Sequence, residues 1–474
     1  MTKNKLPLLG GILFLTITLG GCSQYDDFSL RKEVKSDYND ETIYRYHATL
    51  HPQRSVEEAI KLAANFGQTF GPQTRSTSYS NSTNWEVQSI RYNIEKADTR
   101  STKTNEAIEP VDTIYYLLNN PIANSFCIIA GDRRIGESLL AFSSEGTLNI
   151  DSLDGTEGIN AFLSILPDYY EKRLNVTKRR KDSITNLPDF VNDGKVFHLD
   201  TITRKIIDTT KPNLSLYESV EVHRTENLCK NNWSCNYPYN KLTPIIKHHK
   251  AQLSSIIVTT AHLISSFGYP KEYKGSKLDW SLLHRYRTAE EVAPDNNEYI
   301  LEASNLLRNI GDGIWYKYWG PFETTENFDK IINVLQEMGY SNPSKISTNF
   351  SFEDIIKSID NYSPVPMYAE VKKTRNIHVS PKPYSWLCDG YRVLEIRLKG
   401  GIKYDNSEYP VGHQYKQLHI NWGMGGKYNG YFYANIFNPT LQATYDNAED
   451  EKNTNKQDNQ DYKLKMRAIL NVHP

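Results

Sequence analysis

The sequence has no excess of charge of either sign. Lys and Arg together number 55 and Asp and Glu number 56, which gives a formal net charge of −1. Such a balance gives no general argument for binding to nucleic acid or to an anionic membrane. The runs KRRK at residues 178–181 and EDEK near Glu449 are local, and solvated loops explain them better than binding patches do.

Several motifs that would indicate other functions are also absent. There is no internal repeat, and no transmembrane helix is predicted in the mature part. The glycine-rich stretch at residues 423–430 has no lysine-serine pair and no following helix, so it predicts a tight turn rather than a phosphate site. His248 and His249 lack the HExxH spacing of a zinc site. We therefore expect neither a metal nor a cofactor.

Cysteine is rare, with five in 474 residues. Cys127 and Cys388 lie in apolar, strand-like stretches, where we expect buried free thiols. Cys229 and Cys235 lie close together in a polar stretch, and they could form a small disulfide that the sequence alone cannot prove.

The N-terminus reads as an export signal. Two lysines precede a short apolar run that ends in Leu-Gly-Gly before Cys22. This resembles a bacterial lipobox, so residues 1–21 are predicted to be a lipoprotein signal peptide, Cys22 the lipid attachment site and residues 22–44 a tether. The acidic pair Asp26-Asp27 favours the outer membrane and the cell surface. A plain signal peptide with an incidental cysteine is the alternative.

Residues 45–175 predict a small α+β domain. A capping box at Ser55 precedes an amphipathic helix, four strand-like runs follow, and a second helix closes the segment near Leu174. Residues 176–221 are charged and rich in turn residues, apart from a strand-like KVFHL, and predict a linker.

Residues 222–474 predict a second α+β domain. Helices are expected over 251–267, 297–309, 327–338 and 352–360, and five strand-like runs follow. The first helix is apolar around most of its circumference, which predicts that it crosses the core with its polar N-terminus in a cleft. Ser254 and Ser255 are its N-cap candidates.

Three stretches of this second domain resemble the streptopain family of papain-like cysteine peptidases. They are WSCNYPYN from Trp233, SIIVTTAHLISSFGYP from Ser255, and WLCDGY from Trp386 taken together with HINWGMGG and NGYF. The resemblance implies a papain-like fold with a helical part and a twisted antiparallel sheet. The first domain, with IIAGDRR and SLLAF, resembles the family's Spi-type inhibitory prodomain.

The family's catalytic positions can be carried over one at a time. Ser255 stands at the position of the cysteine nucleophile, Tyr384 at that of the histidine base and Cys235 at that of the oxyanion-hole glutamine. Only Asn421, which would orient the base, and Trp422, which would shield it, match the family.

These replacements predict a cleft without peptidase activity. A serine hydroxyl is a far weaker acid than a thiol and needs a base, and a tyrosine phenol is protonated at neutral pH. Loss of an oxyanion donor alone costs about a hundredfold in rate. Rescue by His378 as base, by Cys235 as a displaced nucleophile or by His262 is possible in principle. We interpret these as a loop histidine, a disulfide partner and a core histidine.

The leading hypothesis is therefore an exported lipoprotein that binds a peptide or a partner peptidase in its cleft, with the prodomain as an intramolecular partner. It would contact the membrane only through the lipid anchor. One alternative is an active cysteine or serine hydrolase that uses displaced residues. Another is an inhibitor that acts through the prodomain on a related peptidase.

Overall fold

The structure is a computed structural model of the chain, and it describes residues 52–70, 85–91, 113–135, 138–153, 158–167, 169–170, 191–192, 195–199, 206–208, 217–288, 291, 297–318, 323–341, 346–371, 382–398, 414–437 and 464–474. The predicted signal peptide, Cys22, the tether and His378 lie outside these residues. None of the helices among the described residues is both long and apolar enough to cross a membrane.

The N-terminal region folds as its sequence pattern predicts. Helix α2 (Val56–Phe70) begins with the expected capping box, in which Ser55 and Glu58 exchange hydrogen bonds of 2.8 and 3.2 Å. Strands β1 (Glu86–Arg91), β2 (Thr113–Asn120), β3 (Ser125–Ala130) and β4 (Leu139–Ser143) form an antiparallel meander, and a buried helix follows at residues 159–167.

Strands also occur in the segment expected to be a linker. Strands β5 (Val191–Asn192), β6 (Lys195–Leu199) and β7 (Ile206–Asp208) form a small sheet, and β6 is the predicted KVFHL run. Strand β8 (Tyr217–Arg224) begins within this segment and pairs with β15 of the C-terminal domain.

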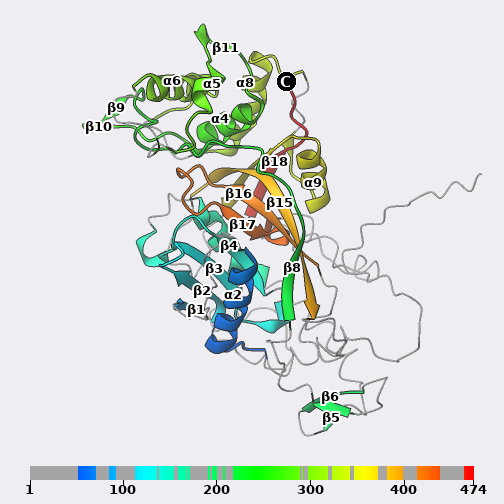
Figure 1. Cartoon of the computed structure of the whole chain (residues 1–474). Helices are drawn as coiled ribbons and strands as arrows, with labels where there is room; N and C mark the ends of the chain where they lie inside the picture. The colour runs from blue at the N-terminus through cyan, green and yellow to red at the C-terminus, as the bar shows by residue number, and fades with distance from the viewer. Residues whose placement is uncertain are drawn as a thin grey trace, which may run out of the picture. The chain divides into compact units, whose positions relative to one another are not determined.

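The C-terminal domain begins with a helical layer (Figure 1). It contains α4 (Ser255–Phe267), α5 (Trp280–Leu283), α6 (Asn297–Gly313), α7 (Thr325–Asp329) and α8 (Ile331–Glu337). Helix α9 (Phe352–Asp360) lies apart from this layer and packs against β14 and β15 (Figure 1). The helix predicted over 327–338 is two helices, α7 and α8, which meet at Lys330. The two-stranded pairs β9 (Ile245–Ile246) with β10 (His249–Lys250) and β11 (Glu272–Tyr273) with β12 (Ser276–Lys277) extend from this layer.

The strands that follow the helices build an antiparallel sheet. They are β13 (Ile346–Ser347), β14 (Val365–Val371), β15 (Tyr384–Leu398), β16 (Gln414–Asn421), β17 (Gly430–Tyr433) and β18 (Leu464–Ile469). One of the five strand-like runs, GYFYANI from Gly430, contains a shorter strand than its apolar pattern indicates, because Ala434–Phe437 turn into a 3-10 helix, η7. Helices with antiparallel strands confirm the predicted α+β class.

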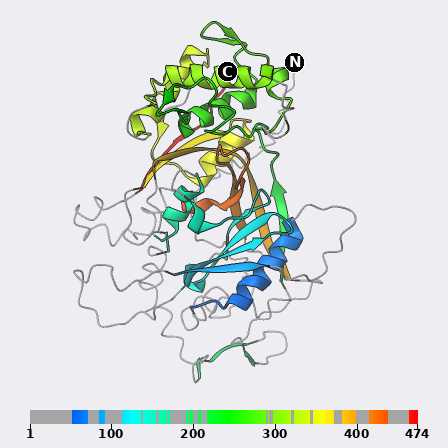
Figure 2. The ribbon, with the colours of Figure 1, turned by 90° about the vertical axis from the view of Figure 1, so that its left-hand side faces the viewer.

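The two regions share one sheet. Strand β4 of the N-terminal region pairs antiparallel with β17, so the strand order runs β1-β2-β3-β4-β17-β16-β15-β14-β18-β13. The same succession from cyan to orange strands can be followed in Figure 2. Gly430 permits this pairing, because a Cβ there would lie 2.9 Å from the Ser143 Cα and closer still to the Phe142 carbonyl oxygen.

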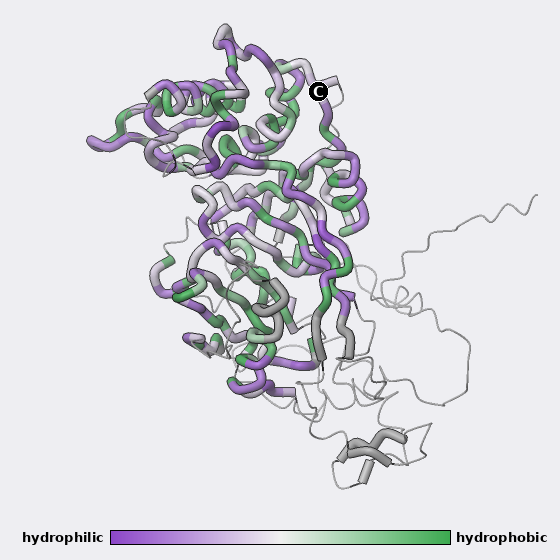
Figure 3. Tube along the Cα trace, in the orientation of Figure 1, coloured by the Kyte–Doolittle hydropathy of each residue, from purple (hydrophilic) through white to green (hydrophobic). Residues whose placement is uncertain are grey.

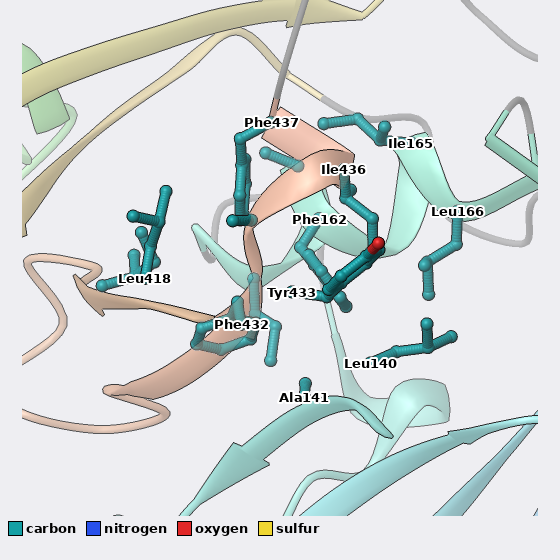
Figure 4. Close-up of a cluster of buried hydrophobic side chains, with 14 of the residues drawn as sticks. Leu140, Ala141, Phe162, Ile165, Leu166, Leu418, Phe432, Tyr433, Ile436 and Phe437 are labelled. Carbon is teal, nitrogen blue, oxygen red and sulfur yellow. The ribbon is translucent and has the colours of Figure 1, made fainter. Parts of the chain in front are cut away.

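A hydrophobic core spans this junction, and we call it the seam. Leu140, Ala141, Phe162, Ile165 and Leu166 come from the N-terminal region and meet Leu418, Phe432, Tyr433, Ile436 and Phe437 from the C-terminal domain (Figure 4). The Phe162 ring packs edge-on against Phe432, with 5.0 Å between the ring centroids. The N-terminal region therefore forms part of the core of the C-terminal domain.

Candidate active site

Helix α4 begins at the position where the resemblance places a nucleophile. Ser254 is the N-cap, and its hydroxyl accepts a hydrogen bond from the Ile256 N–H at 3.1 Å. The helix ends at Gly268, which has a φ of +60° that glycine adopts readily. Ser255 is the first helical residue. It therefore lies at the positive end of the helix dipole, with only 2% of its surface exposed.

The carboxylate of Glu323 lies directly on this helix end. The backbone N–H and the hydroxyl of Ser255 both donate to it, the hydroxyl over 2.5 Å. The Ser255 oxygen also accepts from the backbone N–H of Ser385 at 2.8 Å. Burial raises the pKa of Glu323, and the hydrogen bonds from Ser255 and Ser254 oppose this shift. A carboxylate thus fills the place where a helix end would stabilise a thiolate or an oxyanion.

Reasoning from the sequence missed Glu323. It comes immediately before the capping box of α7, formed by Thr324 and Asn327, so its local context indicates only the start of a helix. It lies 68 positions after Ser255, and the tertiary fold alone brings the two together. No local motif could have identified the pair.

Tyr384 fills the general-base position at the start of β15. Its hydroxyl donates to the Trp422 carbonyl oxygen at 2.8 Å, and 6% of its surface is exposed. Gly158 of the N-terminal region lies against the same ring. A Cβ at Gly158 would be 2.5 Å from Cε1 of Tyr384 and 2.8 Å from Cε3 of Trp422. The Tyr384 ring is therefore buried in the seam, and its hydroxyl bonds to the main chain.

The described cysteines are free thiols, so one of the expectations for them, a disulfide, is wrong. All four described cysteines are buried free thiols, so the disulfide considered between Cys229 and Cys235 is not formed. The two side chains have different neighbours: the Cys229 thiol lies 3.4 Å from the Asn231 carbonyl oxygen, whereas the Cys235 thiol is hydrogen-bonded to Tyr384. Each thiol is therefore buried among its own partners and is not bonded to the other.

The Cys235 thiol is poorly suited to act as a nucleophile. Burial raises its pKa, the nearby Glu323 carboxylate raises it further, and the hydrogen bond with Tyr384 opposes both effects. A thiol with a raised pKa stays protonated and inert at neutral pH. It is also a weak hydrogen-bond donor compared with the amide of a glutamine.

Asn421 and Trp422 are held by a network of structural contacts. The Asn421 amide donates to the Asn231 carbonyl oxygen at 3.1 Å and to Oδ1 of Asn232 at 3.2 Å. The Trp422 ring packs edge-on against Phe432, with 5.1 Å between centroids. Contacts thus connect Ser255 to Glu323 and to the residue after Tyr384, Cys235 to Tyr384, and Tyr384 to Trp422. Asn421 bonds instead to Asn231 and Asn232.

His262 lies deep in the core on α4. Its Nε2 accepts a hydrogen bond from the Trp233 N–H at 2.9 Å, and the two rings stack with 5.8 Å between centroids. Burial lowers the pKa of His262 to about 3. The ring is therefore neutral, and it fits the interpretation as a core histidine rather than as a base for Ser255.

His419 and Asp389, both from the family-like motifs, form a second polar pair. Nδ1 of His419 lies 2.6 Å from Asp389, and Nε2 lies 3.1 Å from the Asn227 amide nitrogen. Both ring nitrogens are thus engaged, and Asp389 also accepts from the Cys229 N–H at 3.3 Å. The pair ties the segment around Asn227 to β15 and β16.

Two family models match the chain. The model described as Peptidase C10 family matches residues 233–432, and the model described as Spi protease inhibitor matches residues 51–169. The first range lies within the C-terminal domain that holds Ser255, and the second lies within the N-terminal region that packs on Tyr384.

A curated relative and two solved structures are also similar. The chain is 20% identical over 370 residues to the thiol protease/hemagglutinin PrtT of Porphyromonas gingivalis, covering 73% of this chain and 37% of that protein. A prointerpain A fragment of Prevotella intermedia has a TM-score of 0.47 and 14% identity, covering 82% of this chain and 99% of that chain. The active wild-type interpain A cysteine protease of the same organism has a TM-score of 0.36 and 16% identity, covering 56% of this chain and 99% of that chain.

Proposed function

Since residues 233–432 belong to the peptidase C10 family and residues 51–169 are a Spi protease inhibitor domain, we propose that the chain is a peptidase homologue without peptidase activity that binds a polypeptide. One observation carries the proposal: the hydroxyl and the backbone N–H of Ser255 both donate to Glu323. The group at the nucleophile position and a helix-end donor are thus both engaged within the protein.

Three parts of the chemistry fail together at this site. The Ser255 hydroxyl has no imidazole at position 384 to take its proton, because a phenol stands there. The helix-end N–H that would bind an oxyanion is taken by a carboxylate, whose negative charge would also repel the oxyanion. Cys235 replaces the remaining oxyanion donor with a buried thiol. Removal of one such donor costs about a hundredfold, so the combined loss abolishes useful turnover.

We propose that the bound polypeptide is either a peptide or a segment of a partner peptidase. The support is the match of residues 233–432 to a peptidase family, together with the presence of Asn421 and Trp422 at positions that the resemblance assigns to its site. A protein that lacks turnover can hold such a chain without cutting it.

The location we propose is the outer membrane, facing the cell surface, with Cys22 carrying the lipid. The support is the apolar run that ends directly at this cysteine and the acidic pair after it. Cys22→Ala should move the protein from the membrane to the soluble fraction. Unchanged fractionation would rule out the lipid anchor.

Peptide hydrolysis tests the loss of activity. Unfolded casein should not be cleaved by the purified chain, and neither a thiol-directed nor a serine-directed active-site probe should label it. The matched control is Ser255→Ala, which should behave as the parent does. Cleavage by the parent that disappears in Ser255→Ala would overturn the proposal.

A second candidate function is a serine hydrolase in which Glu323 acts as the base. One observation favours it: the Ser255 hydroxyl donates to a carboxylate whose pKa burial raises, as a general base requires. Glu323→Gln would then abolish a turnover that the parent shows. A third candidate function is inhibition of another peptidase through the Spi domain. This function requires the seam to open, so that the domain can reach the other enzyme. It would be supported if the full-length protein inhibited a related peptidase.

A further inference from the structure

Residues 236–250 form a segment that we call the basic hairpin. Its first part lies against α6, where the Ser304 hydroxyl donates to the Pro238 carbonyl oxygen at 3.4 Å, and its strand pair β9–β10 projects (Figure 1). Strands β9 and β10 pair through Ile246 with His249, and the turn between them has positive φ at Lys247 (49°) and His248 (72°). This is the backbone of a type I′ turn, which usually contains Asn-Gly rather than Lys-His. Two cationic or titratable side chains therefore occupy the tip where small residues are favoured.

Hydrogen bonds hold the base of the basic hairpin in place. The Thr243 hydroxyl donates to the Ala251 carbonyl oxygen at 2.7 Å, and the Asn240 amide donates to the same oxygen at 3.1 Å. The Lys250 ammonium donates to the Thr243 carbonyl oxygen at 2.9 Å. The hairpin is thus a defined structure that presents a fixed surface.

Large apolar side chains of the basic hairpin face water. Tyr237 is 81% exposed, Ile245 is 70% exposed and Leu242 is 39% exposed. Single exposed apolar residues are common, but here three occur within nine consecutive positions, 237–245. Removal of these three apolar side chains from water would be favourable.

The charged side chains of the basic hairpin itself are of one sign. Between Glu226 and Glu272 the sequence contains no acidic residue, whereas the basic hairpin carries Lys241, Lys247 and Lys250 beside His248 and His249. The chain as a whole is nearly neutral, so this concentration of positive charge is local. Its complement is a negatively charged surface.

We propose that the basic hairpin docks on an anionic lipid surface. The hairpin projects from the edge of the helical layer, and its tip is hydrophilic (Figures 1 and 3). A projecting element cannot enclose a peptide, but it can insert Tyr237 and Ile245 between lipid headgroups. Tyrosine is enriched at this interface, and lysine stems lie along the apolar zone with the ammonium groups among the phosphates. This contact would be additional to a lipid anchor.

Vesicle sedimentation tests the proposal with the chain from Ser23 onward, which lacks Cys22 and keeps the whole compact unit Asp40–Pro474. This protein should bind vesicles of phosphatidylcholine that contain about 30 mol% phosphatidylglycerol, and it should not bind vesicles of phosphatidylcholine alone. Each lysine contributes about fivefold to such binding, so Lys241→Gln with Lys247→Gln should weaken the binding about 25-fold. Tyr237→Ser with Ile245→Ser should weaken it as well.

The matched control is Tyr362→Ser with Lys357→Gln, a similarly exposed aromatic and lysine next to α9. It should bind as the parent does. Three results would overturn the proposal: no binding to the anionic vesicles, equal binding by the hairpin variants and the parent, or equal losses in the hairpin and control variants. Binding to polyglutamate without binding to vesicles would identify an acidic polypeptide as the partner instead.

Discussion

At Ser255 the replacement of sulfur by oxygen changes little in volume and much in acidity. A helix end can help to ionise a thiol, because the thiol pKa is about 8.5, but it cannot ionise a hydroxyl. With a neutral hydroxyl at residue 255, the positive potential of the helix end is not neutralised by that residue. In this chain the Glu323 carboxylate lies against the helix end instead. The carboxylate is therefore understandable as the group that stabilises the helix once a thiolate is gone.

Removal of this carboxylate should destabilise the fold. Glu323→Ala leaves the Ser255 N–H without its acceptor, and we expect a loss of about 2 kcal/mol in the free energy of unfolding. Chemical denaturation measures it. The control is Glu326→Ala, because Glu326 is 79% exposed and forms only a surface ion pair with Lys330, and it should change stability by less than about 0.5 kcal/mol. Equal effects of the two substitutions would show that the contact with Ser255 contributes nothing.

Repair of catalysis should need several changes at once. Ser255→Cys alone places a thiol beside the Glu323 carboxylate, which raises its pKa, and Tyr384→His alone places an imidazole near a hydroxyl. We expect casein hydrolysis from neither, nor from the two together. Activity is expected only when Glu323→Gln also removes the negative charge from the helix end, with Cys235→Gln as a further aid, because such groups act as a unit. Hydrolysis by any single variant would contradict this expectation.

Helix α4 shows which elements can be predicted from sequence. Its apolar periodicity, its serine cap and its terminal glycine are all local signals, and the structure has the helix within the predicted range. The division of 327–338 into α7 and α8 is not a periodicity signal, because Lys330 lies at the junction with an ordinary helical conformation. Likewise, η7 continues the apolar pattern of β17, so the pattern alone does not show where the strand ends.

The buried histidine of α4 should make the protein sensitive to acid. His262 stays neutral in the fold because burial lowers its pKa to about 3, whereas the unfolded chain takes up a proton below about 6.5. The contribution of His262 to the free energy of unfolding is therefore constant above pH 6.5. Between pH 6.5 and pH 3 it falls by about 1.4 kcal/mol for each pH unit of acidification.

Denaturation at pH 7 and pH 5 measures this contribution. His262→Gln keeps an acceptor for the Trp233 N–H and should reduce the difference between the two pH values. His248→Gln is the control, because His248 lies exposed in the basic hairpin and should leave the difference as it is in the parent. A difference unchanged in His262→Gln would show that another group is responsible.

At the scale of the whole molecule, the strands were predictable but their pairing was not. The alternation of apolar residues indicates β4 and β17 separately, yet the residue pairs Phe142 with Tyr431 and Ala141 with Phe432 join segments almost 290 positions apart. The sequence therefore predicts two α+β domains and does not reveal that they share one sheet. Gly158 of the N-terminal region also lies against Tyr384, so the seam extends to the position that the resemblance assigns to the general base.

The seam should hold the two domains together without a covalent link. A site for a specific protease, inserted next to residues 178–181, allows the purified chain to be cut there. We expect both fragments to elute together at the size of the intact chain, because separation would expose the aromatic core around Phe162 and Phe432 to water. Uncut protein should also remain in one piece on storage, since a chain without a working nucleophile cannot cleave itself.

Phe162→Ala supplies the test of this mechanism. Truncation of a buried phenylalanine costs about 3–5 kcal/mol, and in the cut chain this loss acts directly on the association of the fragments. The two fragments of the cut variant should therefore separate at a lower denaturant concentration than the two fragments of the cut parent do. Trp315→Ala is the control, because Trp315 is 75% exposed and lies outside the seam, and it should not change the dissociation. If the fragments of the cut parent separate in plain buffer, the β4–β17 pairing and the seam are too weak to keep the Spi domain over Tyr384, and the domain can leave as a prodomain would.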